Sequence, residues 1–290
     1  PRLFDLIDES QTGELDSVSS SKFGPVVDAC TLCDLCFMTK CPYVPPHEFN
    51  VDFPHLMLRY RAVEKRNGQV SRNKEQLSNT DRNGKWLGYF ATLVNWGNKV
   101  GNKFTRIIIQ KLIGIKKTAA LPKFYRKSFT ARAKREIPTI NVNAPAFGRK
   151  AVLYAACFVN YNNPQIGGAA RKVLSRNGVE TEVVYPRCCG MPKLEHGDLE
   201  AVAENARKIS KEMGSWINNG YDIIALVPSC ALMLKFEWPL ILPNDKNVKN
   251  LSSATYDITE YLVNIAKKER IAEGWHPIPN GVTVHLACHA

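Results

Sequence analysis

The nine cysteines of this 290-residue chain fall into two separate groups, and this grouping restricts its possible folds more than any other feature. The first group consists of Cys30, Cys33, Cys36 and Cys41, and the second of Cys157, Cys188, Cys189, Cys230 and Cys288. No cysteine lies in the long stretch between the two groups. Grouped thiols indicate metal or redox chemistry more than a disulfide framework.

The first group has the spacing of a ferredoxin cluster-binding run. Two residues separate Cys30 from Cys33 and Cys33 from Cys36, and Pro42 directly follows Cys41. Four residues lie between Cys36 and Cys41, whereas the usual ferredoxin run has three at this point. We expect these four cysteines to bind a 4Fe-4S cluster, and the alternative is a structural zinc site.

From its two ends, we expect this sequence to be a piece of a longer protein. The chain begins with Pro1 rather than Met and stops just after Cys288. In two-cluster ferredoxins the last cysteine of each run binds the other cluster, so we expect a matching run before Pro1 and two clusters in the full-length protein.

The hydrophobic content of 44% is that of an ordinary folded protein. No apolar run approaches the roughly 18 to 20 residues that span a bilayer, and the amino terminus has no signal-peptide pattern. We expect a cytoplasmic protein, with a peripheral position on the inner face of the cytoplasmic membrane as a further option.

The net charge of +12 has one source. Between Asp81 and Glu136 there are 14 Lys or Arg and no acidic residue, which leaves 25 basic and 27 acidic residues in the remainder of the chain. Within this stretch apolar residues recur at helical spacing from Trp86 to Ile115, so we expect a basic amphipathic helix or helix pair. It could pack on its own domain, contact a membrane surface, or bind an acidic partner or nucleic acid.

The rest of the chain divides into a polar segment and an alternating one. Residues 67–85 contain Asn-Gly pairs and little apolar periodicity, which predicts a turn-rich linker. From residue 150 on, strand patterns at 151–156, 180–185, 222–227 and 282–287 alternate with helix patterns at 166–176, 199–217 and 258–268. This alternation predicts βαβ units and a parallel sheet.

The second cysteine group carries a family resemblance. Its motifs are Cys157, the run Cys188-Cys189-Gly190-Met191-Pro192, and Pro228-Ser229-Cys230. They resemble the cysteine-rich CCG domain of the B subunit of heterodisulfide reductase. The run from Pro228 to Pro239 and the ferredoxin-then-CCG order resemble the C subunit of anaerobic glycerol-3-phosphate dehydrogenases.

The resemblance implies two ferredoxin clusters followed by two CCG repeats, in a protein that passes electrons from a flavoprotein dehydrogenase to a membrane quinone. Cys288 would then begin the second repeat. The fold class expected is a mixture of α+β and α/β. Its expected parts are the C-terminal half of an α-helical 4Fe-4S ferredoxin-type module at 1–66, a linker and basic amphipathic helical region at 67–149, a βαβ-type CCG domain at 150–280 and the start of a truncated second CCG repeat at 281–290.

Cys157, Cys188, Cys189 and Cys230 are expected to meet where parallel strands end, and four thiolates held together need a metal to neutralise them. The resembled domain closes with a Cys-x-x-Cys pair, whose first position is Val227 here. Either an iron-sulfur centre or zinc could therefore occupy this site. Tyr154 and Tyr161 could flank it.

We therefore expect a non-catalytic iron-sulfur electron-transfer subunit, which relays electrons between a flavoprotein dehydrogenase and a quinone or thiol acceptor. One alternative is a thiol/disulfide reductase that uses a CCG-bound cluster, although Val227 counts against it. Another is a zinc-stabilised basic binding module. We do not expect nucleic acid as a partner.

Overall fold

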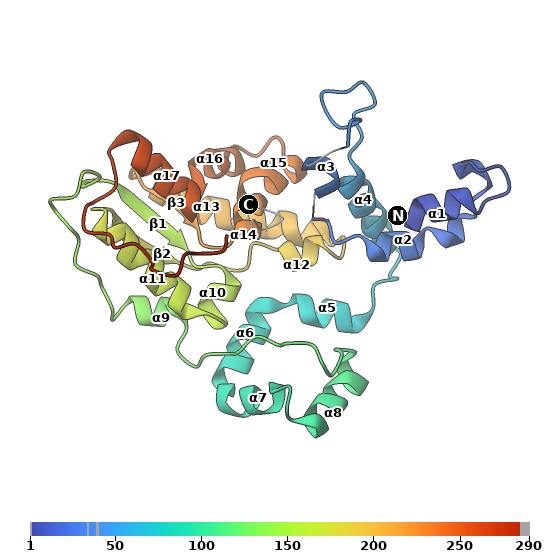
Figure 1. Ribbon diagram of the computed structural model, residues 1–290, viewed down its shortest axis with the longest axis horizontal. Coiled ribbons are helices and arrows are strands. Elements are labelled where there is room, and N and C mark those ends of the chain that lie inside the picture. Colours follow the sequence, from blue (N-terminus) through green and yellow to red (C-terminus); the bar gives the residue numbers. More distant parts are fainter. Residues whose placement is uncertain (1, 34, 39–40, 285–290) are drawn as a thin grey trace. The chain divides into compact units, whose positions relative to one another are not determined.

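The computed structural model describes residues 2–33, 35–38 and 41–284, which form two compact units (Figure 1). The first contains the described residues up to Val70, together with Leu194–Asp198. The second contains Ser71–Lys193 and the described residues from Leu199 on. The described chain is mostly helical, with a single four-stranded sheet.

Where it is described, the first unit contains helices joined by turns and loops, and no strand. Its helices are α1 (Arg2–Asp8), α2 (Gly24–Ala29), α3 (Leu35–Met38) and α4 (Phe53–Arg66), with 3-10 turns at Leu15–Ser17 and Ser20–Lys22. The longest helix, α4, begins at Asp52, whose side chain accepts a hydrogen bond from the His55 N–H. Its buried Met57 and Leu58 belong to a small core with Val26 and Val27 of α2.

The second unit contains the predicted parallel sheet. Its strands are β1 (Lys150–Tyr154), β2 (Glu180–Val184), β3 (Asp222–Ala225) and β4 (Thr255–Asp257). All three pairings are parallel, and the strand order is β2-β1-β3-β4. Leu153 of the central strand β1 lies opposite Val183 on one side and Ile224 on the other. The predicted parallel sheet in the cysteine-rich region is therefore confirmed.

Helices cover both faces of this sheet, because the strands are apolar on both sides (Figure 1). On one face Leu153 and Ile224 share a core with Phe129, Leu174 and Tyr261. These three residues come from α9 (Phe129–Ala133), α11 (Pro164–Arg176) and α17 (Ile258–Lys268). On the other face α13 (Leu199–Asn218) and α16 (Lys246–Ala254) contact β3 and each other.

Short helices follow the strands and shape the loops at their carboxyl ends. They are α10 (Cys157–Tyr161), α12 (Met191–Leu194), α14 (Pro228–Leu232), a π-helical turn at Met233–Glu237 and α15 (Trp238–Ile241). Cys157 is the first residue of α10, Cys230 lies within α14, and Trp238 at the start of α15 donates a hydrogen bond to the Cys189 carbonyl. These segments therefore position the cysteines.

The prediction of a turn-rich linker over residues 67–85 is wrong, because most of this segment is helical. It contains α5 (Arg72–Ser78) and the first part of α6 (Thr80–Tyr89). The Asn83-Gly84 pair is not a turn: Gly84 is buried in α6, where an added Cβ would lie 2.2 Å from the Tyr161 ring. Here glycine permits close packing between α6 and α10 instead of a chain reversal.

The basic region forms two further helices, α7 (Ala91–Asn98) and α8 (Lys103–Ile113), instead of one continuous helix. Much of the apolar stripe predicted from the sequence is exposed on them: Leu93 is 66% exposed, Phe104 74% and Leu112 71%. Arg106 of α8 is buried, unlike the apolar side chains around it. Its guanidinium donates hydrogen bonds to the carbonyls of Lys116, Lys117 and Ala119.

The last predicted strand covers residues 282–287. Of these, residues 282–284 are described and have no regular secondary structure. Residues 285–287 and Cys288 lie outside the described residues. The sequence also contains no sign of β4, since Thr255-Tyr256-Asp257 is short and has no apolar run. Among the described residues, no helix has the length and apolar character needed to cross a membrane.

Candidate functional site

Three neighbouring strands end beside four cysteines. Cys157 opens α10 just after β1, the pair Cys188-Cys189 follows β2, and Cys230 lies in α14 after β3. Because β2, β1 and β3 are adjacent and parallel, their carboxyl ends meet at one edge of the sheet. The fold thus brings together residues separated by up to 73 positions, as the sequence predicted.

The four thiols form two contacting pairs. The Cys157 and Cys188 sulfurs are 3.7 Å apart, and the Cys189 and Cys230 sulfurs are 3.3 Å apart. All four are free thiols; Cys188, Cys189 and Cys230 are buried, and Cys157 is half-buried. In a tetrahedral site with metal–sulfur bonds of about 2.3 Å, neighbouring sulfurs would lie about 3.8 Å apart, close to the Cys157–Cys188 spacing.

The backbone beside two of these cysteines adopts conformations that L-residues rarely take. Ala156, directly before Cys157, has φ +51° and ψ 151°, a combination that is almost restricted to glycine. Gly190, directly after Cys189, has φ +95°, and an added Cβ there would lie 3.3 Å from Val202. The first turn therefore stores strain, and the second requires glycine.

The charge within the cluster is centred on Cys188. Hydrogen bonds with the thiols of Cys157 and Cys189 hold the pKa of Cys188 well below its ordinary value, and the Gly190 N–H, 3.4 Å from the sulfur, adds to this effect. The same hydrogen bonds, together with burial, raise the pKa values of Cys157 and Cys189. The geometry favours one thiolate, so ionising all four requires a bound cation.

Asp81 of α6 holds the loop that carries this thiolate. Its Oδ2 accepts a hydrogen bond of 3.0 Å from the Cys188 N–H, and its Oδ1 accepts one from the Tyr185 hydroxyl. Burial, followed by the charge of Asp81, raises the pKa of Tyr185 and also raises the pKa of Tyr161 to about 12. Both phenols are therefore neutral at physiological pH, and that of Tyr185 donates to Asp81.

Two buried aromatic side chains hold the other side of the same loop. The Tyr154 hydroxyl donates a 2.6 Å hydrogen bond to the Arg187 carbonyl, and the Trp238 indole N–H donates one of 3.2 Å to the Cys189 carbonyl. Tyr154 was expected beside the site and lies there. Nothing in the sequence indicated the contacts of Asp81 and Tyr185, because no local pattern links them to the cysteines. Trp238 lies in the run from Pro228 to Pro239 that carries the family resemblance, but its contact with the Cys189 carbonyl was not predicted.

The first cysteine group is less enclosed. Cys30, Cys33 and Cys41 are half-buried and Cys36 is exposed. Arg61 of α4 fixes the start of this loop, because its guanidinium donates hydrogen bonds to the carbonyls of Val27, Cys30 and Glu195. These contacts all lie within the first unit.

No three His, Cys, Asp or Glu side chains in the described ranges are arranged to hold a metal ion. The donor set nevertheless suits iron-sulfur binding, since it offers four thiols in each group and, at the second, a lowered thiol pKa. Cys288 lies outside the described residues, so the second group is represented here by its other four cysteines.

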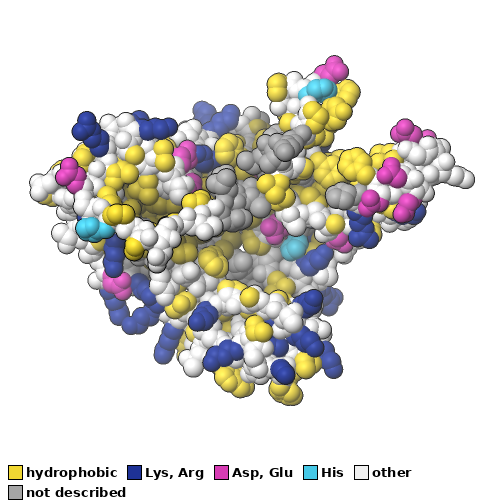
Figure 2. All heavy atoms as spheres, viewed as in Figure 1, with side chains coloured by type: hydrophobic (Ala, Val, Ile, Leu, Met, Phe, Trp, Pro, Cys, Tyr) yellow, Lys and Arg dark blue, Asp and Glu magenta, His cyan; other side chains and the backbone are white. Residues whose placement is uncertain are grey.

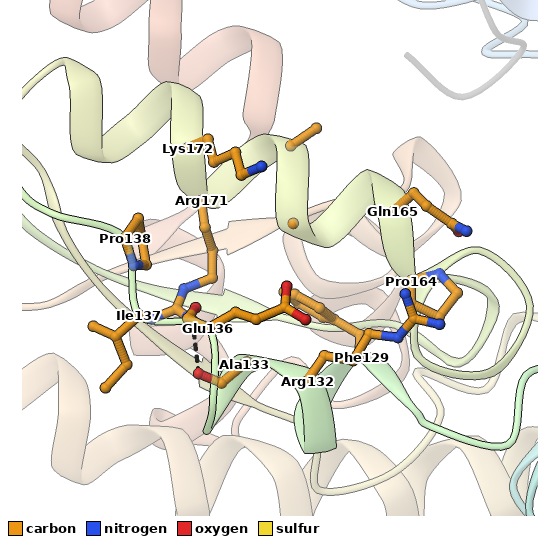
Figure 3. Close-up of a pocket in the computed structure, with 12 residues that line it drawn as sticks. Phe129, Arg132, Ala133, Glu136, Ile137, Pro138, Pro164, Gln165, Arg171 and Lys172 are labelled. Atoms are coloured by element: carbon orange, nitrogen blue, oxygen red, sulfur yellow. Dashed lines mark hydrogen bonds between the residues drawn. The ribbon is translucent and has the colours of Figure 1, made fainter.

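A separate hollow, of about 500 Å³, is lined by Arg132, Arg171 and Lys172 and by no cysteine (Figure 3). Figure 3 shows Arg171 turned toward the backbone, where it donates hydrogen bonds of 2.9 Å to the carbonyls of Ala133 and Glu136. This arginine joins α9 to α11 and is not available to a ligand. We therefore place the functional site at the second cysteine group.

Comparison with known families agrees with this choice. The cysteine-rich CCG domain family matches residues 151–235, a range that includes Cys157, Cys188, Cys189 and Cys230. Residues 151–235 form a CCG domain. All four contacting thiols thus belong to the CCG domain.

The chain also has distant relatives. It is 27% identical over 222 residues to the C subunit of anaerobic glycerol-3-phosphate dehydrogenase of Escherichia coli K12, an alignment covering 73% of this chain and 52% of that protein. It is 28% identical over 145 residues to lactate utilization protein A of Geobacillus thermodenitrificans, covering 48% of this chain and 57% of that protein. The chain spans about half the length of these relatives, and no solved structure matches it significantly.

Proposed function

We propose that this protein is an iron-sulfur electron-transfer subunit of an oxidoreductase complex. It relays electrons between a flavoprotein dehydrogenase and a quinone or thiol acceptor. The observation that carries the proposal is the meeting of four reduced thiols from three strand ends, at sulfur–sulfur distances of 3.7 and 3.3 Å within each pair. Four buried or half-buried thiols that converge in this way suit a bound metal or cluster, because the thiolate is the form of cysteine that binds metals.

In this proposal Cys157, Cys188, Cys189 and Cys230 hold an iron-sulfur centre or zinc, and Cys30, Cys33, Cys36 and Cys41 hold a 4Fe-4S cluster. A bound cluster would supply one-electron chemistry, while the protein sets its potential and orientation. The Gly190 N–H points at the Cys188 sulfur and stabilises negative charge there. Asp81 and Trp238 fix the loop through its backbone and leave the sulfurs free to bind.

The relatives support a place in a complex, since one of them is named as a subunit of a dehydrogenase. The surface of α7 and α8 supports a contact with an anionic membrane. Figure 2 shows hydrophobic and basic side chains side by side in the part of the molecule that Figure 1 labels α7 and α8. Exposed Trp96 and Phe104 alternate there with Lys99 and Lys103.

The test is metal analysis of protein purified without oxygen. We expect iron and sulfide, with an electron paramagnetic resonance signal of a reduced cubane after dithionite. Cys33→Ser should remove the signal of the first site and leave the second, while Cys189→Ser should do the reverse. Stoichiometric zinc without iron at both sites would contradict the proposal and favour a zinc-stabilised binding module.

A second candidate function is thiol/disulfide exchange, favoured by the Cys189–Cys230 distance of 3.3 Å. Oxidation of these two thiols to a disulfide would release two electrons and two protons to a disulfide substrate, which would become two thiols. Metal-free protein that reduces a small disulfide, with loss of this activity in Cys230→Ser, would support this candidate. Activity that follows the iron content would exclude it.

A further inference from the structure

Asp81 is the only acidic residue in helices α6 to α9, a stretch that is otherwise rich in Lys and Arg. It is half-buried, and among the residues that the structure describes it forms no ion pair with a cation. Its two oxygens instead accept hydrogen bonds from the Cys188 N–H and the Tyr185 hydroxyl, as the ionised form of a carboxyl group does. A negative charge without a neighbouring cation thus lies beside the thiol loop.

This charge acts on the same side chains as the thiols do. After burial, it is the largest cause that raises the pKa values of Tyr161 and Tyr185. The charges of Cys157 and Cys188 raise the same two pKa values to a smaller extent. Because such effects fall off with distance and are strongest where water is excluded, Asp81 and the thiols are close enough to influence one another.

Two backbone amides beside the Cys188 sulfur have opposite consequences for a cluster bound there. The Gly190 N–H lies 3.4 Å from this sulfur, and a donor in that position stabilises the more negative, reduced state of a cluster. The Cys188 N–H donates to Asp81 instead of to a sulfur, and its acceptor brings a negative charge. A nearby negative charge favours the oxidised state, which carries one electron fewer.

We propose that Asp81 is a positioning residue whose charge lowers the reduction potential of the centre held by the CCG thiols. The inference rests on the proposed function and deepens it, because it names the residue that sets how strongly this centre reduces its acceptor. A lower potential makes the reduced centre a stronger electron donor. The carboxylate on α6 therefore favours the transfer of electrons out of the site over their storage within it.

Three substitutions separate the charge of Asp81 from its hydrogen bonds. Asp81→Asn removes the charge but keeps the size of the side chain and one acceptor oxygen. Asp81→Glu keeps the charge and moves it by one methylene group. Glu212→Gln is the matched control, since it removes one negative charge from an exposed position of α13 in the same unit.

The midpoint potential is measured in the full chain that also carries Cys33→Ser, so that the centre at the CCG thiols alone gives the paramagnetic signal. The signal is followed during a potentiometric titration at fixed pH, and iron and sulfide are measured in the same samples. We expect Asp81→Asn to raise the potential and change the ratio of oxidised to reduced centre at least tenfold, which is about 59 mV for a one-electron couple. Asp81→Glu and Glu212→Gln should change this ratio less than threefold.

Tyr185→Phe should have an effect of the opposite sign. It keeps the charge of Asp81 but removes one of the two donors that disperse this charge, so the potential should fall below that of the wild type. An unchanged or raised potential in this variant would contradict the inference, also where Asp81→Asn does not retain its iron.

The outcomes distinguish this inference from the proposed function. Iron at the CCG thiols with the same potential in wild type and Asp81→Asn overturns the inference alone. An equal rise in Asp81→Asn and Asp81→Glu does so too, because it would show that hydrogen-bond geometry, and not charge, sets the potential. Zinc in place of iron at these thiols overturns both the inference and the electron-transfer proposal.

Discussion

The Cys188 N–H donates a 3.0 Å hydrogen bond to Oδ2 of Asp81, a residue 107 positions earlier in the chain. Asp81 lies in the first turn of α6, in a segment that the sequence suggested to be a linker. Through this contact, and through the packing of Gly84 against Tyr161, α6 forms part of the thiol site. The helical region is therefore a structural element of the CCG site.

Replacing Asp81 should destabilise the second unit. Asp81→Ala removes the acceptor of the Cys188 N–H and of the Tyr185 hydroxyl, and we expect a loss of about 2–4 kcal/mol in the free energy of unfolding. Asp81→Asn keeps one acceptor oxygen, so its cost should be about 1–2 kcal/mol. Urea denaturation measures both values. The exposed Glu212→Gln is the control, and equal stability of Asp81→Ala and this control would contradict the prediction.

Gly84→Ala should destabilise the protein although alanine is the better helix former. The added Cβ would lie 2.2 Å from the Tyr161 ring, so α6 or α10 must shift, at a cost of about 1–3 kcal/mol. At Gly214, which has open space, the same substitution should stabilise by about 0.5–1 kcal/mol. Thermal and urea denaturation of the two variants should therefore change in opposite directions. A stabilised Gly84→Ala would show that the α6–α10 contact is looser than described.

Ala156→Gly should stabilise the protein by about 1 kcal/mol, because Ala156 has φ +51° before Cys157 and glycine adopts this conformation without strain. The control is Ala201→Gly in α13, which should cost about 0.5–1 kcal/mol as an ordinary helical position. Both are measured by urea denaturation. A loss of stability in Ala156→Gly similar to that of the control would mean that the turn is not strained.

The sequence predicted the sheet but not its last strand. The strands β1, β2 and β3 are apolar or β-branched runs separated by amphipathic helices, and these local signals are strong. The strand β4 has three residues and pairs only with β3, so its conformation depends on tertiary contact. Gly84 was misread for a related reason, since a glycine in a turn and one in a tight helix contact look the same in sequence.

The meeting of the four thiols was predicted, whereas the residues around them were not. Cys157, Cys188, Cys189 and Cys230 follow the ends of recognisable strands, and a parallel sheet must bring such positions together. Asp81 and Trp238 reach the same loop from distant helices. Nothing in the local sequence marks Asp81, and the run that contains Trp238 carries a family resemblance but does not indicate which backbone carbonyl its indole contacts.

Alkaline pH should weaken the fold through its buried tyrosines. Burial raises the pKa of Tyr161 to about 12, whereas an unfolded tyrosine ionises near pH 10. The unfolded state therefore loses its proton first, so the stability that depends on the neutral phenol is complete below about pH 10 and decreases toward pH 12. The decrease should be at most about 1 kcal/mol per pH unit for this residue. Tyr161→Phe should make the decrease shallower, while exposed Tyr89→Phe should not; identical pH profiles would contradict this.

Arg61→Ala should weaken iron binding at the first cysteine group and leave the second unaffected. The guanidinium binds the carbonyls of Val27 and Cys30, so its loss frees the loop that presents Cys30 and Cys33. The segment Leu194–Asp198 also packs closely on α4, because a Cβ added at Gly197 would lie 2.4 Å from the Arg61 backbone. The measurement is iron content and the reduced-cubane signal during incubation with a chelator, with exposed Arg66→Ala on the same helix as control. We expect Arg61→Ala to lose the signal of the first site at least fivefold faster than the wild type. Equal rates in both variants would show that Cys30 is held in place without Arg61.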